Sequence, residues 1–114
     1  MTATLNSFAS EKQLTASEVE IVSATSSEKK FIGMATVTNT STSNVEVTAW
    51  RILTATTGTT GSGGNWVWKK TIPANTTERI TPIMGHVLDN SMKISALAAT
   101  ASVINIDISG TTET

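Results

Sequence analysis

Apolar and polar residues alternate with a period of two along most of the chain, which is the pattern of strands with one buried face. Short polar segments separate these stretches, and no stretch has the 3.6-residue period of an amphipathic helix. The expected strands cover residues 19–21, 31–38, 45–53, 66–72, 76–81, 92–98 and 101–109. The pattern predicts an all-β protein, a single antiparallel β-sandwich of about seven or eight short strands, of the jelly-roll or immunoglobulin-like type.

Six small polar residues in a row, 39–44, lie between two of these strands. Asn and Ser side chains bond readily to their own backbone and suit a turn. We therefore expect residues 31–38 and 45–53 to form an antiparallel hairpin. Within the second of these strands the apolar positions change face after Ala49, which indicates a β-bulge there.

Three isoleucines in the last strand, Ile104, Ile106 and Ile108, alternate with polar residues. They are expected in the core, against the face of Val45 and Val47 or against the strand at 31–37. Residues 82–90 fit no strand and are expected to form a helical turn or an irregular crossover. Residues 110–114 are expected to be a polar tail.

The 114 residues fit one domain, residues 1–114. Residues 54–65 have four glycines and no apolar side chain larger than that of Ala, so we expect a flexible surface loop. The N-terminus lacks the pattern of a signal peptide, and no stretch approaches the roughly 20 apolar residues of a membrane span. These features predict a protein made in a cytoplasm that has no membrane partner.

Composition excludes several classes of site. Thr and Ser account for 22 and 13 of the 114 residues, and β-branched Thr favours strands. The absence of Cys excludes disulfides, thiolate metal sites and a Cys nucleophile, and a single His excludes a multi-His metal centre. A net charge of −1 argues against a nucleic-acid partner.

Candidate catalytic residues are few. His86 is the one side chain that could serve as the base of a nucleophile triad, and it is expected to be a turn or crossover residue. The carboxylates expected on wet strand faces or in turns are Glu18, Glu20, Asp89 and Asp107. None has the apolar context that tunes a catalytic acid, which argues against a small glycan-active enzyme. We therefore expect a non-enzymatic protein without a catalytic residue, cofactor or metal.

Trp66 and Trp68 are two residues apart and are expected to share one face of their strand. An aromatic pair beside a loop can fill a core or subunit interface, or it can stack on sugar rings. The core or interface role is the expected one. The two tryptophans are the candidate interface residues.

Residues 31–110 resemble the small all-β virion proteins of tailed bacteriophages. The resemblance is carried by ATVTNTSTSNVEVTAW at 35–50 and by TIPANTTERITPIMGHVLDNSMKISALAATASVINIDISG at 71–110. In that family a strand ends in an Asn-Thr-Ser turn, an Ile-Pro-Ala turn follows a variable loop, and the closing strand ends in Ser-Gly. This chain has Asp89-Asn90-Ser91 where the family often has Gly-Asp.

The resemblance implies a structural role in a virion. The expected function is that of a capsid decoration (cement) protein that binds the major capsid protein, and a homotrimer would suit a three-fold capsid site. The alternative is a tail or tail-fibre component whose Trp66 and Trp68 contact host-surface glycan. The number of copies per particle distinguishes the two roles, because hundreds of copies indicate decoration and a few dozen or fewer indicate the tail.

Overall fold

The computed structural model describes residues 3–52, 66–89 and 91–114, so the loop expected at 54–65 lies outside the described residues. Within these ranges the chain forms strands and one short 3-10 helix. The elements are β1 (Ala3–Gln13), β2 (Val19–Ser23), β3 (Lys29–Asn39), β4 (Val45–Ile52), β5 (Trp66–Ile72), β6 (Thr77–Arg79), η2 (Thr81–Ile83), β7 (Val87–Asp89), β8 (Lys93–Ala98) and β9 (Ile104–Glu113). No helix in these ranges is long and apolar enough to cross a membrane.

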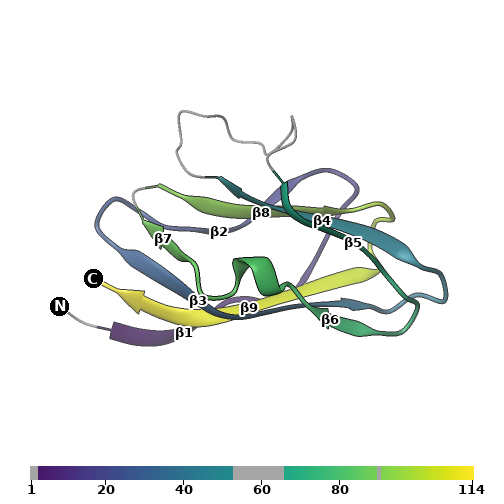
Figure 1. Ribbon diagram of the computed structural model, residues 1–114, viewed down its shortest axis with the longest axis horizontal. Helices are drawn as coiled ribbons and strands as arrows, with labels where there is room; N and C mark the ends of the chain where they lie inside the picture. Colours follow the sequence, from purple (N-terminus) through teal and green to yellow (C-terminus); the bar gives the residue numbers. More distant parts are fainter. Residues whose placement is uncertain (1–2, 53–65, 90) are drawn as a thin grey trace.

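The strands form two antiparallel sheets that pack face to face (Figure 1). The β1 sheet has the order β1-β9-β3-β6, with β7 also paired to β3, and the β2 sheet has the order β2-β8-β4-β5. The predicted β-sandwich is confirmed. The pairs are nested, since β1 pairs with β9, β2 with β8, β3 with β6 and β7, and β4 with β5. This nesting is a jelly roll, whereas the first two strands of an immunoglobulin-like sandwich are neighbours in one sheet.

Apolar side chains from both sheets fill the space between them. Ile104, Ile106 and Ile108 of β9 are fully buried, and they belong to the same cluster as Val45 and Val47 of β4. This confirms the predicted core face of the last strand. The sheets are therefore held together by hydrophobic burial, the main favourable term in folding.

The segment between β3 and β4 crosses from one sheet to the other, so the predicted hairpin is wrong. The buried Asn39 side chain shapes this crossing. Its Nδ2 donates to the carbonyls of Ser43 (2.8 Å) and Ile72 (3.0 Å), and its Oδ1 accepts from the N–H (2.9 Å) and the Oγ (2.8 Å) of Ser41. The turn residues were recognised, but the local sequence does not specify which sheet the next strand joins.

The two ends of the described chain pair with each other (Figure 1). β1 was not predicted, because most of its residues are exposed and they show no apolar alternation. The expected polar tail is also wrong, since Gly110–Glu113 continues β9 and pairs with β1 on one side and β3 on the other. Backbone pairing rather than side-chain burial defines these strands.

β6, η2 and β7 follow one another along the same edge of β3 (Figure 1). β6 pairs with residues 36–38 of β3, and β7 pairs with residues 29–31. η2, which contains Pro82, lies between them. The expected helical turn is confirmed, whereas β7 was not predicted.

Candidate interaction surface

The two candidate tryptophans lie on either side of a β-bulge. Ala49 pairs with Trp68 and the next residue, Trp50, pairs with Trp66, so Val67 is the extra residue. A bulge does lie opposite Ala49, but its extra residue is in β5, whereas β4 pairs with β8 through Ala49 and Trp50 without a register shift. The bulge expected within β4 is therefore in its partner strand. The expectation that the two share a face stays a prediction.

Trp68 is half-buried and packs against the core. The side chain of Trp66 lies outside the described part of the chain. The interface role of both tryptophans stays a prediction.

Exposed apolar side chains lie in one row across the β1 sheet. In the register, Leu5 of β1 is opposite Thr111 of β9, Thr111 is opposite Phe31 of β3, and Phe31 is opposite Val87 of β7. Leu5 is 84% exposed, Phe31 46% and Val87 42%. Because directly paired residues share a face, this row lies on the outer side of the sheet.

Met34 extends the row into a patch. It is 40% exposed and is opposite Ser109, which lies two residues along β9 from Thr111, the partner of Phe31. We call Leu5, Phe31, Met34 and Val87 the apolar patch. In the described ranges, these are the large hydrophobic side chains that are exposed.

A shallow groove of about 470 Å³ lies within the patch. Its lining residues are Leu5, Asn6, Ser7, Gly33, Met34, Ser109 and Gly110. Gly110 is required here, because a Cβ atom at this position would lie 1.8 Å from the Phe31 carbonyl oxygen. This close approach occurs where β3 has a register shift between Ile32 and Met34. The glycine of the Ser109-Gly110 pair thus has a structural reason.

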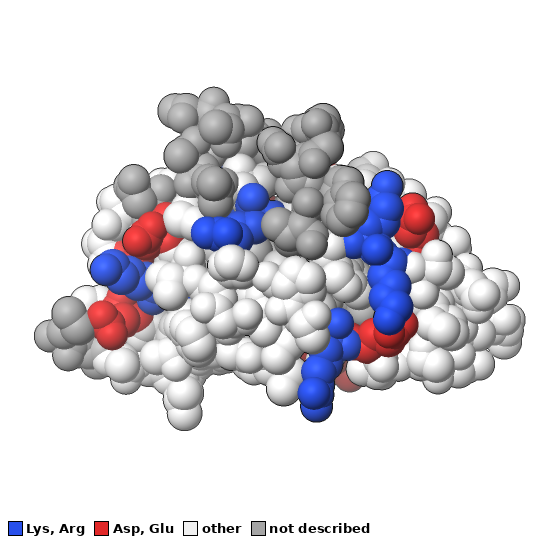
Figure 2. Space-filling view, in the orientation of Figure 1, with Lys and Arg blue, Asp and Glu red and all other residues white. Residues whose placement is uncertain are grey.

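A row of charged residues borders the apolar patch. Lys29 of β3 lies between Glu113 of β9 and Asp89 of β7 in the register, directly beside the row of Phe31. An apolar centre with a polar rim is the usual arrangement of a protein–protein interface. On the side of the molecule seen in Figure 2, charges of both signs occur in small groups on a mostly uncharged surface.

The patch was missed at the sequence level for two reasons. Leu5 lies in a segment for which no strand was expected, so it had no assigned face. Phe31 was expected in a strand, and the adjacent Phe31-Ile32 pair was a usable signal, because neighbouring strand residues point to opposite faces. Ile32 is fully buried and Phe31 is exposed.

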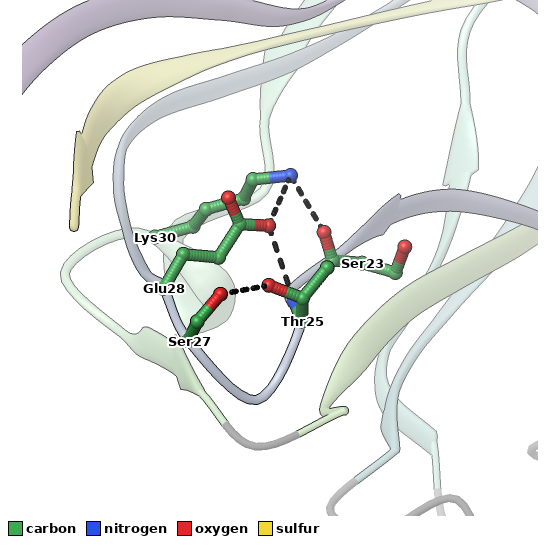
Figure 3. Close-up of polar contacts among 5 residues, drawn as sticks. All are labelled: Ser23, Thr25, Ser27, Glu28 and Lys30. Carbon is green, nitrogen blue, oxygen red and sulfur yellow. Dashed lines mark hydrogen bonds and ion pairs between the residues drawn. The ribbon is translucent and has the colours of Figure 1, made fainter.

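A polar cluster lies where β2 leads into β3 (Figure 3). Lys30 Nζ donates to the Ser23 carbonyl at 2.6 Å, lies 3.4 Å from Glu28 Oε1 and is 5.5 Å from the centre of the Phe8 ring. The Glu28 carboxylate also accepts the Thr25 N–H at 3.1 Å. That hydrogen bond, with a smaller contribution from the Lys30 charge, holds the pKa of Glu28 below its usual value against a weaker opposing effect of desolvation.

The Lys30 contacts join the two sheets. Lys30 belongs to β3 of the β1 sheet, and Ser23 belongs to β2 of the β2 sheet. A second cross-sheet contact joins Lys70 of β5 to Glu78 of β6. Each of the two lysines thus contacts a residue of the opposite sheet.

His86 lies between η2 and β7, as expected for a crossover residue. Its carbonyl accepts the Ile32 N–H at 2.9 Å, and its N–H donates to the Ile83 carbonyl at 3.3 Å. The first bond attaches the crossover to β3, and the second closes the turn after η2.

Three of the four carboxylates considered for catalysis have contacts with residues of other segments. Ser95 Oγ donates to Glu18, Lys93 Nζ lies 3.5 Å from Glu20 Oε1, and the Glu11 N–H donates to Asp107 Oδ1 at 2.7 Å. In the part of the chain that the structure describes, no three His, Cys, Asp or Glu residues form a group that could hold a metal ion.

No protein-family model and no curated protein sequence matches this chain. Among solved structures, a chain in the structure of infectious bursal disease virus Gx strain is similar to it, with a TM-score of 0.49 and 16% identity. The match covers 97% of this chain and 32% of that chain, so this chain spans about a third of the other's length. At this level the likeness carries no argument about function.

Proposed function

We propose that this chain is a non-enzymatic structural protein of a bacteriophage virion, a capsid decoration protein that binds the major capsid protein and stabilises the capsid lattice. The apolar patch on the β1 sheet carries the proposal. Extended exposed apolar surface rimmed by polar residues marks sites of protein interaction. The groove within the patch is shallow and open, which suits a protein surface better than an enclosed small molecule.

Two further observations support the proposal. Residues 31–110 resemble small all-β virion proteins, and Gly110, which ends the resembling segment, is needed for the approach of β9 to β3. Jelly rolls also recur in viral capsid domains, although this is an analogy at the level of the fold, because lectins and cupins share the architecture.

The alternative role in the tail, with glycan stacked on Trp66 and Trp68, has less support. Trp68 packs against the core, and a stacking platform needs a free ring face. We therefore favour attachment through the apolar patch over glycan recognition through the tryptophans.

The copy number of the chain in purified virions tests this proposal. Quantitative mass spectrometry against the major capsid protein should give hundreds of copies per particle, because decoration follows the repeat of the lattice. A few dozen copies or fewer would assign the chain to the tail. Its absence from purified particles would overturn the virion role altogether.

A further inference from the structure

We infer that the chain forms a two-fold dimer in which residues 3–7 of β1 pair antiparallel with the same residues of a second copy. The two β1 sheets would then form one continuous sheet. This inference goes beyond the proposed function and holds whether or not the chain is part of a virion.

Most edges of the described sheets carry features that oppose pairing with another strand. Charged residues, Pro, bulges and short strands are the usual protections. β6 and β7 have three residues each and are separated by η2, which contains Pro82. β5 has the adjacent lysines Lys69 and Lys70. β2 has five residues, including Glu20, with a register shift directly after that glutamate.

The second half of β1 is protected in the same way. Its pairing with β9 shifts register between Ser7 and Ala9 and again between Ala9 and Lys12. Glu11 lies between the positions of the second shift and has a φ of 47°, which is left-handed backbone. A partner strand would not find a regular ladder along residues 8–12.

The first half of β1 has none of these protections. Ala3 to Ser7 pairs with Glu113 to Ser109 without a register shift. The segment ATLNS has no charge and no Pro, and all five residues are exposed. Among the edges of the described sheets, this is the stretch best suited to accept another strand.

The segment is complementary to itself, which favours a second copy as the partner. A two-fold axis at Leu5 places Leu5 opposite its symmetry mate, Thr4 opposite Asn6, and Ala3 opposite Ser7. No like charges meet, and like charges directly opposite one another would be unfavourable. The two Leu5 side chains, which are almost fully exposed in the single chain, would cover each other.

Pairing at Leu5 also joins the two apolar patches. Leu5 ends the row that continues through Thr111, Phe31 and Val87. In the dimer, two such rows would meet end to end on one face of the continuous sheet. A contact of this kind is isologous and closes as a dimer, in place of the trimer expected from the sequence.

Disulfide trapping tests the position of the axis. The chain has no cysteine, so Leu5→Cys introduces a single thiol. Directly opposite residues in an antiparallel pair have Cα atoms about 4.5–5.5 Å apart, which a disulfide can bridge. Under mild oxidation, Leu5→Cys should form dimers about tenfold faster or more than Val87→Cys, a matched exposed position on β7, because pairing raises the local thiol concentration. Equal rates would overturn the inference.

A second pair of variants keeps Leu5 in place. When Ala3→Cys and Ser7→Cys proteins are mixed, the disulfide between the two variants should form in preference to either homodimer. A statistical mixture would overturn the proposed register. In analytical ultracentrifugation, the unmodified chain should show a concentration-dependent dimer that Leu5→Lys abolishes and Val87→Lys retains. A monomer at all concentrations, or a trimer, would contradict the two-fold pairing.

Discussion

At Asn39, one buried side chain makes four hydrogen bonds in the crossing between the sheets, two donated by Nδ2 and two accepted by Oδ1. Replacing Asn39 with a residue that lacks the amide removes the donor to buried backbone groups such as the Ile72 carbonyl. Asn39→Ala should therefore lower the free energy of unfolding by about 1–3 kcal/mol in urea denaturation. Thr42→Ala, an exposed change in the same turn, should cost less than about 0.5 kcal/mol. Equal costs would show that the amide bonds do not stabilise the crossing.

Two glycines on facing strands have different steric surroundings. A Cβ at Gly110 would overlap the Phe31 carbonyl oxygen, whereas a Cβ at Gly33 would meet its nearest atom, the Ser109 carbonyl oxygen, at 3.5 Å. Gly110→Ala should destabilise the protein by about 3 kcal/mol or more, because backbone atoms must shift. Gly33→Ala should change stability by less than about 1 kcal/mol. Thermal unfolding of both variants measures the difference, and a tolerated Gly110→Ala would contradict the close approach of β9 to β3.

At the scale of the element, β9 contributes three buried isoleucines to the core. Truncating Ile106 to Ala removes apolar contacts and leaves a cavity, which should cost about 2–5 kcal/mol. Asn105→Ala, at the next position of the same strand, changes the outer face and serves as the control. A loss below about 1 kcal/mol for Ile106→Ala would place that face at the surface.

The segment that joins β2 to β3 should contribute to the acid sensitivity of the fold. The pKa of Glu28 is lowered in the folded state, mainly by the Thr25 N–H. The stabilisation is therefore complete above the unfolded pKa of Glu, about 4.3, and is lost as the pH falls through the lower folded value. Between pH 7 and pH 3 the Tm of the unmodified chain should fall by more than that of Glu28→Gln.

Exposed Glu46 is the control for this measurement, because it lies on β4, away from the cluster. Glu46→Gln removes an exposed carboxylate without changing the Thr25 and Lys30 contacts, and its loss of Tm on acidification is the reference for that of Glu28→Gln. If Glu28→Gln and the unmodified chain lose the same Tm on acidification, the Thr25 and Lys30 contacts do not stabilise the folded state.

Strands with a clear apolar alternation were predictable from the sequence. The bounds of β5 match the expected 66–72, and the inward face of β9 was identified. β1 was not predictable in this way, because it lies on the edge of a sheet and buries little more than Ala9. The sequence also did not predict which strands pair, since the turn at Asn39 fits a hairpin and a crossing between sheets equally well.

At the scale of the whole molecule, the apolar patch exists only because pairing aligns residues that are far apart in the sequence. Leu5, Phe31, Val87 and Thr111 come from four strands and meet in one register row. The tryptophan pair was the stronger signal in the sequence, because two aromatic residues two positions apart suggest a shared face. The bulge between them, with Val67 as the extra residue, is a feature of strand pairing that the sequence of β5 alone does not reveal.

Attachment to a virion lattice through the apolar patch is the function that we propose for the chain. Its most direct test is the addition of purified protein to particles that lack it, with bound protein measured at saturation. Phe31→Ser should weaken binding about 30-fold, the equivalent of about 2 kcal/mol for a buried aromatic anchor. Leu97→Ser, a change on β8 of the other sheet, should bind like the unmodified chain, and moderate salt should have little effect at a net charge of −1. Full occupancy of the particles by Phe31→Ser, or binding abolished by moderate salt, would contradict attachment through the apolar patch.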